Sequence, residues 1–181
     1  MSKLREKYKK EAVAEMKKQF GFKNDWQVPR IEKIVINSGI GKFANDNALV
    51  KEVADSLTTI AGQKTVLTDS KSSIAGFKIR KGLKIGVKAT LLGKRMWDFL
   101  EKLIGAAIPR IRDFQGIKET AVDKGGNLNI GIKEHMVFPE IMPENVKRTI
   151  SLQVTVVTTG KKRAESLALF KFLKFPIKSA S

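Results

Sequence analysis

The chain has 181 residues, of which 35 are Lys or Arg and 18 are Asp or Glu, so its net charge is +17 at pH 7. That length fits one domain, and the 42% of hydrophobic residues can form a core, which argues against a disordered basic tail. The absence of cysteine and the single histidine, His135, exclude disulfides, thiolate nucleophiles and a histidine-ligated metal, so no cofactor is expected.

Two amphipathic helices are predicted in the first third of the chain. Apolar residues recur every four positions from Leu4 to Phe20, and a second apolar stripe runs from Leu49 to Ile60. Their predicted caps are Gly21 after the first helix, Asn45 or Asn47 before the second, and Gly62 after it.

β-Branched and alternating apolar residues predict several strands. In Ser151–Thr158, Leu152, Val154 and Val156 alternate with polar residues, which is typical of a strand with one buried face. The other predicted strands are Arg30–Asn37, Thr65–Thr68, Phe77–Arg80, Leu83–Leu91 and Asn127–Ile132, with a loop over Asp69–Gly76.

Two further helices are predicted. An apolar stripe over Met96–Ile104 indicates one, which Pro109 should end, and the other spans Arg163–Leu173. Arg112–Gly126 is rich in turn residues and is predicted as loop, and Pro139 and Pro143 make the next connection irregular. Strands interspersed with helices predict an α+β fold, as a single domain over residues 1–181, with an antiparallel sheet and helices packed on one face.

Basic residues are concentrated in one segment without acids. The 25 residues from Lys71 to Arg95 contain eight Lys or Arg and no Asp or Glu. A compact chain tolerates a high positive charge best when a polyanion neutralises it, so this segment favours a nucleic-acid site over a merely solvated face.

The same sequence gives no sign of a membrane protein. The longest uncharged stretch, Thr149–Gly160, has 12 residues, whereas a membrane span needs about 18 apolar ones. The charged start leads into no apolar segment, so no signal peptide is visible, and a cytoplasmic protein is expected.

The segment Asn37-Ser38-Gly39-Ile40-Gly41-Lys42 resembles part of a phosphate loop but lacks its spacing, because Phe43 follows Lys42 where Ser or Thr is needed. Nucleotide hydrolysis is therefore not expected. Two interpretations stay open: a tight turn that needs positive φ, or glycines that let the backbone approach a ribose-phosphate chain, with Asn37 bonding a sugar or base edge.

Gln63 and Lys64 follow the second helix in what is, taken alone, a solvated turn. They gain a functional meaning if the turn lies beside the strand Leu83–Leu91, whose polar members are Lys84, Lys88 and Thr90. Hydroxyl, amide and ammonium groups on a sheet face suit the 2′-hydroxyls and phosphates of RNA.

The segment Ser70–Gly82 combines small residues, four basic residues and one aromatic, Phe77. Small residues permit close approach, cations bind phosphates, and an aromatic ring stacks on a base for about 1–3 kcal/mol. For a single Phe the common alternative is core packing, but so basic a loop is seldom needed for stability.

The remaining conspicuous residues are interpreted as structural. Trp97, Phe99 and Phe114 are expected in the core, and His135 has no serine or carboxylate partner at catalytic spacing. Phe170, Phe172 and Phe175 among lysines would fit a membrane-surface helix, but core packing explains them as well.

Taken in chain order, several motifs together resemble the bacterial family of large-subunit ribosomal protein five, which binds 5S ribosomal RNA. The resemblance covers nearly the whole chain. It rests on Gln27–Ile34, Asn37–Gly41, Ala61–Lys64, Ala75–Arg80, Ile85–Leu91, Ile108–Phe114, Gly126-Asn127, Phe138–Ile141 and Phe175-Pro176.

The resemblance implies a non-catalytic α+β protein of the large subunit, with a basic projecting loop, that anchors 5S ribosomal RNA in the central protuberance. It implies 23S ribosomal RNA and neighbouring proteins of the central protuberance as further partners. The implied RNA-binding residues are Lys33, Asn37, Gly39, Gly41, Gln63, Lys64, Phe77, Lys88 and Thr90.

Two more contacts are implied by the resemblance. A basic loop would reach the transfer RNA in the peptidyl site through Ser72, Ser73, Ile74, Ala75, Gly76, Lys78, Arg80, Lys81 and Gly82. A bridge to protein thirteen of the small-subunit head would involve Arg110, Arg112, Asp113 and Gln115.

The chain departs from the family pattern at three places. Leu92 stands where a cation is usual, the segments Pro143–Asn145 and Lys147–Thr149 differ from the family, and Gly160–Arg163 is more basic than expected. Three other functions compete with the ribosomal one: a DNA-compacting protein, an RNA-modifying enzyme, for which no cofactor or metal site is found, and a membrane-surface protein.

Overall fold

The computed structural model describes residues 3–44, 46–77, 79–142, 144, 146 and 148–178, with the backbone alone at Phe77. Its α-helices are α1 (Lys3–Lys7), α2 (Val13–Phe20), α3 (Asn47–Ala61), α4 (Gly93–Lys102) and α5 (Arg163–Phe172). Its strands are β1 (Ile31–Gly39), β2 (Val66–Asp69), β3 (Lys84–Leu91), β4 (Ile117–Lys118), β5 (Leu128–Ile132), β6 (Leu152–Thr158) and β7 (Ile177–Lys178).

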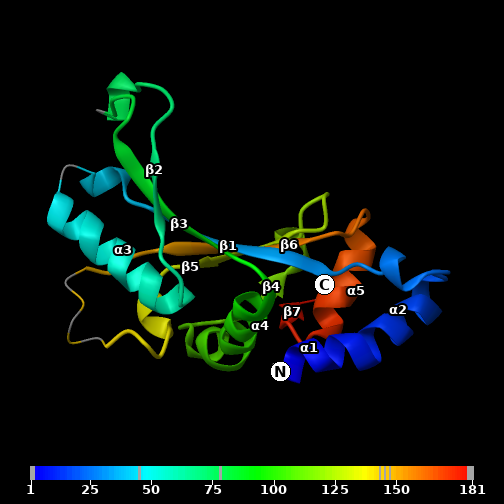
Figure 1. The fold of residues 1–181 in the computed structure, drawn as a ribbon. Coiled ribbons are helices and arrows are strands. Elements are labelled where there is room, and N and C mark those ends of the chain that lie inside the picture. The colour runs from blue at the N-terminus through cyan, green and yellow to red at the C-terminus, as the bar shows by residue number, and fades with distance from the viewer. Residues whose placement is uncertain are drawn as a thin grey trace. The chain divides into compact units, whose positions relative to one another are not determined.

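Five of these strands form one antiparallel sheet in the order β2-β3-β1-β6-β5 (Figure 1). The short strands β4 and β7 pair separately and in parallel. The predicted α+β class with an antiparallel sheet is therefore confirmed.

The contacts of the chain fall into two compact units. The first contains Met1–Ile34, Leu92–Ile130 and Thr155–Ser181, and the second contains Val35–Leu91 and Gly131–Val154. Strands β1, β5 and β6 have residues in both, so each unit contains part of the sheet. The single domain over 1–181 stays a prediction.

In the second unit, α3 packs beside β3 through an apolar stripe (Figure 1). Val50, Val53, Leu57 and Ile60 of this helix are buried, at the spacing that the sequence predicted. Gly62, with φ of 63°, ends the helix in the left-handed conformation, as predicted.

In the first unit, the N-terminal helices cover α4 and α5: α1 contacts α4, and α2 contacts α5. The predicted helix over Leu4–Phe20 forms, with a π-helical turn at Tyr8–Ala12 between α1 and α2. The Phe170 and Phe175 rings meet edge to face at 5.4 Å between centroids, and Trp97 is 7% exposed, so these aromatics are core residues.

The structure corrects the predicted N-cap of α3. Asp46 is the N-cap, because its carboxylate accepts hydrogen bonds from the N–H groups of Ala48 and Leu49 at 3.0 and 3.1 Å. Asn47 is instead the first helical residue, and Asn45 lies outside the described residues.

Three further predictions of secondary structure were wrong in part. The described residues of Phe77–Arg80 form no strand of the sheet, because Phe77 ends a 3₁₀ turn that begins at Ala75 and Ile79 pairs locally with Ile74. Lys78 lies outside the described residues. The predicted loop Arg112–Gly126 contains β4, which pairs with β7. Helical turns continue past α4, as a π-helix over Leu103–Ala107 and a 3₁₀ turn that includes Pro109.

Candidate nucleic-acid interface

One side of β1, β2 and β3 in the second unit carries polar side chains. Along β3, Val87, Ala89 and Leu91 are buried, so the alternate residues face outward. The antiparallel register pairs Val66 of β2 with Lys88, and Thr68 with Gly86. From the outward positions of these strands we define the polar face as Asn37, Val66, Thr68, Lys84, Gly86, Lys88 and Thr90. Val35 and Gly39 also alternate with the buried residues of β1 and are not counted in it.

The centre of the polar face is organised by the missing side chain of Gly86. A Cβ built there would lie 2.5 Å from Thr68 Oγ1 and 3.7 Å from Asn37 Oδ1. Glycine therefore lets the Thr68 hydroxyl and the Asn37 amide converge from the two neighbouring strands onto β3. Asn37 itself is exposed, between the buried Ile36 and Ser38.

Gln63 and Thr90 are brought together at one end of this face. The Gln63 amide donates a hydrogen bond from Nε2 to the Thr90 carbonyl oxygen at 3.0 Å. The turn after α3 therefore does lie beside the strand, which was the condition for a functional role of Gln63. The bond fixes the direction of the amide, and Gln63 and Thr90 are half-buried.

Cations accompany these polar groups. Lys64 and Lys88 are exposed, and among the described residues neither has an ion-pair partner. Lys84 is paired with Asp69 at 2.6 Å, so its charge is partly neutralised. Lys33 is half-buried on the part of β1 that belongs to the first unit.

Gly39 and Gly41 line a hollow of about 850 Å³ in the second unit, together with Lys42 and Arg148. Neither glycine has a positive φ, and a Cβ on either would meet nothing within 4 Å, so the turn does not need glycine for its backbone conformation. Positive φ therefore does not account for these glycines, and the approach of a ribose-phosphate chain stays a prediction. The Arg148 guanidinium lies over the Phe43 ring at 5.6 Å.

The predicted transfer-RNA loop connects β2 to β3 and is closed by backbone hydrogen bonds. Ser70 donates its N–H to the Leu83 carbonyl at 2.8 Å, and Gly82 donates to the Ser70 carbonyl at 2.9 Å. The described loop residues from Ser72 to Gly76 and from Arg80 to Gly82 are exposed. The side chain of Phe77 and all of Lys78 lie outside the described residues.

The predicted bridge residues belong to the first unit. Arg110 ends the 3₁₀ turn Ile108–Arg110, and Arg112, Asp113 and Gln115 follow in the turn before β4. All four are exposed, and Asp113 has a positive φ of 53°.

The described residues also bear on two other kinds of site, a metal centre and a membrane span. Within the part of the chain that the structure describes, no group of three or more His, Asp or Glu side chains is placed to hold a metal ion. No helix in that part is long and apolar enough to cross a bilayer. His135 is buried, and its Nδ1 accepts a hydrogen bond from the Ile150 N–H at 3.3 Å, which is the structural role expected for it.

Known proteins resemble this chain along almost its entire length. A family model described as ribosomal protein L5 matches residues 24–80, and the model for the C-terminus of the same ribosomal family matches residues 84–177. The chain belongs to the ribosomal protein L5 family.

Curated relatives agree, and each carries the name large ribosomal subunit protein uL5. The one from Colwellia psychrerythraea is 46% identical over 98% of both chains. Those from Fervidobacterium nodosum and Kosmotoga olearia are 46% and 49% identical over 97% of this chain, and over 95% and 96% of their own.

Membership in the L5 family decides the class of function. The family consists of structural, non-enzymatic proteins of the large ribosomal subunit, so the predicted ribosomal role is confirmed and the RNA-modifying enzyme is excluded. The L5 family also accounts for the basic composition, because rRNA neutralises the charge of ribosomal proteins.

The structure adds residues to the interface that sequence reasoning did not single out. Thr68, Gly86 and the 58% exposed Val66 belong to the polar face with the predicted residues. A glycine inside a strand of β-branched and basic residues was the available signal for Gly86, since such a glycine often marks close approach of another group. Leu92, where the resemblance led us to expect a cation, is 59% exposed directly before α4.

Proposed function

We propose that this L5-family chain binds 5S ribosomal RNA through the polar face and attaches that RNA in the central protuberance of the large subunit, in the cytoplasm. The observation that supports this most is the convergence of Asn37 and Thr68 at Gly86, with Lys88 two residues further along β3. Amide, hydroxyl and ammonium groups on one exposed sheet face match the ribose hydroxyls and phosphates of a folded RNA.

Further residues complete the proposed RNA contact. Gln63, Lys64 and Thr90 extend it along the strands of the second unit. Lys33, on the part of β1 that belongs to the first unit, is proposed as a separate RNA contact. The glycines beside Lys42 let the RNA backbone approach the hollow, and Phe77 would stack on a base. 23S ribosomal RNA and neighbouring proteins of the central protuberance are the other partners in this proposal.

The decisive test is the affinity for 5S ribosomal RNA of Asn37→Ala and Lys88→Ala, with Lys51→Ala as the matched control. Lys51 is an exposed lysine on α3 in the same unit, away from the polar face. We expect a loss of about 3- to 10-fold for Asn37→Ala, the value of one hydrogen bond. Lys88→Ala should reduce the steepness of log affinity against log salt concentration by about 1, because one phosphate contact is lost.

Wild-type affinity for both variants would remove the polar face from the binding site. Equal affinity of the wild-type chain for 5S ribosomal RNA and for duplex DNA of the same length, at fixed salt, would show that the chain binds any polyanion by charge and would contradict specific recognition of 5S ribosomal RNA.

We also propose that the loop between β2 and β3 contacts transfer RNA in the peptidyl site. Its exposed cations, Arg80 and Lys81, support this, and the hydrogen bonds of Ser70 allow the loop to be shortened without opening the sheet. Replacing residues 72–81 by a short Gly-Ser turn should leave most of the affinity for 5S ribosomal RNA and weaken retention of transfer RNA on reconstituted subunits. Unchanged retention would argue against this contact.

The bridge to protein thirteen of the small-subunit head is the third part of the proposal. Arg110 and Arg112 are exposed cations in the first unit, flanked by Asp113 and Gln115. The double substitution Arg110→Ala and Arg112→Ala should weaken subunit association in sedimentation, whereas Lys124→Ala, an exposed lysine of the same unit, should not. Association equal to wild type would contradict the bridge.

A further inference from the structure

Trp26 is a large aromatic side chain that the fold leaves outside. It is 80% exposed, whereas the other tryptophan, Trp97, is 7% exposed. Leaving a side chain of this size in water gives up the hydrophobic free energy of burying it, so folding does not explain its position. An exposed aromatic is one of the residues that most often anchor a binding partner.

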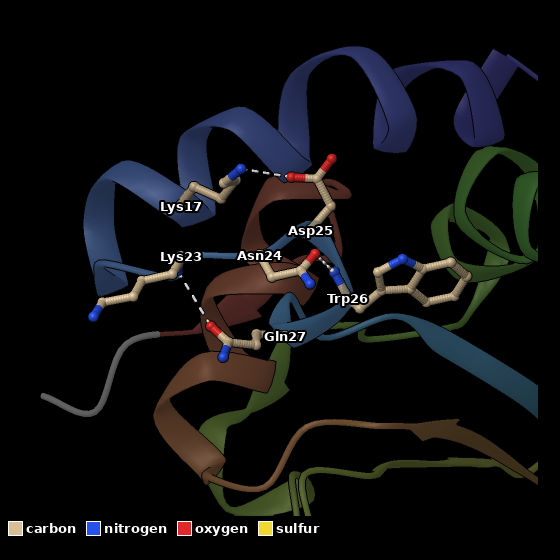
Figure 2. A network of polar contacts seen from close by, with 6 residues as sticks. All are labelled: Lys17, Lys23, Asn24, Asp25, Trp26 and Gln27. Carbon is tan, nitrogen blue, oxygen red and sulfur yellow. Dashed lines mark hydrogen bonds and ion pairs between the residues drawn. The ribbon is translucent and has the colours of Figure 1, made fainter.

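The turn that carries Trp26 is held in place by three side-chain contacts (Figure 2). Asn24 accepts the Trp26 N–H at its Oδ1 at 3.2 Å, and the Gln27 amide oxygen accepts the Lys23 N–H at 3.2 Å. The Lys17 ammonium pairs with the Asp25 carboxylate at 2.6 Å. The ring is thus presented by a fixed turn, and binding through it would cost little ordering of the backbone.

A pocket of about 460 Å³ opens beside the ring, entirely within the first unit. Trp26 and Phe22 supply its aromatic lining, and Arg30, Lys161 and Lys162 supply its cations. Two hydrogen bonds join two of its lining residues, because the N–H of Arg30 donates to Thr159 Oγ1 at 3.1 Å and the N–H of Thr159 donates to the Arg30 carbonyl at 2.9 Å.

The charges of the pocket favour an anion next to a planar group. The Arg30 guanidinium lies over the Trp26 ring at 5.3 Å, and Lys161 and Lys162 are exposed. Glu165 is the only acid among the described residues that line the pocket. With most of its surface still accessible, the indole keeps area for a second planar group in addition to Arg30.

We propose that this pocket binds one unpaired nucleotide of RNA. Its base stacks on Trp26, and its phosphate lies against Lys161, Lys162 and Arg30. An acidic peptide would satisfy the cations but offers a planar group to the indole only where it also carries an aromatic or Arg residue, whereas every nucleotide combines a π-face with a phosphate. The site consists of residues outside the polar face, so it does not depend on the binding of 5S ribosomal RNA there.

Fluorescence titration of the full chain with a short single-stranded oligoadenylate tests the proposal. Stacking should quench Trp26, while the buried Trp97 provides a constant background. Trp26→Ala should lower the affinity by about 5- to 100-fold, which corresponds to the loss of one stacked base, and Trp26→Phe should keep most of it. These two variants are titrated with a labelled oligonucleotide, since they lack the reporter ring.

One further variant, a double substitution, and two controls separate stacking from charge. The double substitution Lys161→Ala and Lys162→Ala should lower the slope of log affinity against log salt concentration by up to about 0.7 for a single strand, the value of the one phosphate contact in the proposed site. The matched controls are Lys9→Ala with Lys10→Ala, an exposed lysine pair of the first unit, and Leu92→Ala, an exposed apolar residue of the same unit. Both should leave the affinity of the chain for oligoadenylate unchanged.

Three results would overturn the proposal. The first is wild-type affinity of Trp26→Ala for oligoadenylate. The second is equal affinity for single-stranded RNA and duplex RNA of the same length, without quenching of Trp26 fluorescence. Non-specific attraction between the basic chain and the phosphates would then explain the binding. The third is self-association of the wild-type chain that Trp26→Ala abolishes in sedimentation velocity, which would make a second copy the occupant. Loss of 5S binding in Asn37→Ala has no bearing on this outcome, so the two sites can fail separately.

Discussion

At Gly86 the absence of a Cβ lets the Thr68 hydroxyl lie against the backbone of β3, and Asn37 approaches from the other neighbouring strand. A single methyl group would occupy that space. The positions of Thr68 and Asn37 on the polar face therefore depend on how closely the three strands pack. That packing requires glycine at position 86.

Gly86→Ala is expected to destabilise the chain by about 1–3 kcal/mol, because the new Cβ would lie 2.5 Å from Thr68 Oγ1. Thr68→Ala removes that oxygen, so the double variant should recover most of the loss. Urea denaturation of the two single variants and the double variant measures the coupling between the sites. Additive losses would show that the hydroxyl is not what the Cβ meets.

His135 is the one histidine, and the fold holds it in its neutral form. Burial lowers its pKa below the usual value, and the nearby Glu52 carboxylate opposes this shift. Its Nδ1 accepts the Ile150 N–H, so protonation at Nδ1 would place two donors against each other in a buried position.

The free energy of unfolding should therefore fall as the pH is lowered through about 6.5, the unfolded pKa of histidine, and this loss should level off below the lowered folded pKa. The unfolded chain takes up the proton first, which gives the sign. His135→Asn, which offers an acceptor but does not titrate, should be less stable at neutral pH and flatter across this window. Urea denaturation between about pH 7 and pH 5.5 checks both. An unchanged slope in the variant would assign the pH dependence to other groups.

Among the elements, α3 is the one whose start was misassigned from the sequence and can be tested directly. Asp46→Ala should cost about 0.5–2 kcal/mol, because two N–H groups at the helix start lose their acceptor. Asp55→Ala, an exposed acid inside the same helix, controls for the change in charge. Asn47→Ala should have little effect. Chemical denaturation distinguishes these outcomes, and a larger cost for Asn47→Ala than for Asp46→Ala would restore the original prediction.

The periodicity of apolar residues predicted the helices and strands that bury one regular face. It did not predict elements that depend on which segment they pair with. The stripe of α3 and the alternation of β6 were readable because each buries one face of a regular element. Ile79 was predicted as part of a strand, but its partner, Ile74, is local and the chain turns between them. β4 and β7 are two residues long and exist only through each other, so neither has a pattern of its own.

Part of the candidate site was also predictable from the sequence. Asn37, Gln63 and Thr90 came from motifs, and the structure places Gln63 against the Thr90 carbonyl. Thr68 and Val66 join them through the register of β2 and β3, which no single-strand pattern contains. Trp26 was missed because exposure cannot be read from residue type: most tryptophans are largely buried.

The charge of +17 acts on the molecule as a whole. Without a polyanion, like charges repel within each compact unit and oppose folding. Added salt shortens the range of this repulsion, from about 30 Å at 0.01 M to about 8 Å at 0.15 M. The free chain should therefore be more stable at the higher ionic strength.

Thermal unfolding at these two ionic strengths should show a rise in Tm with salt for the free chain. The variant Lys9→Gln with Lys10→Gln lowers the net charge from +17 to +15, since two positive charges are removed. At low salt the Tm of this variant should be higher than that of the wild-type chain, and its Tm should change less when salt is added. A Tm that falls with salt would show that attractive pairs such as Lys17–Asp25 outweigh the repulsion.

Backbone hydrogen bonds join Ser70 to both Leu83 and Gly82, so the segment between β2 and β3 leaves and rejoins the sheet at adjacent points. A peptide inserted among its exposed residues, such as Ser72 or Ser73, would not need to separate β2 from β3. The chain should therefore still fold when a reporter peptide, an affinity tag or a fluorophore-labelling sequence is inserted there. A label at this position could be used to follow the protein during assembly of the subunit.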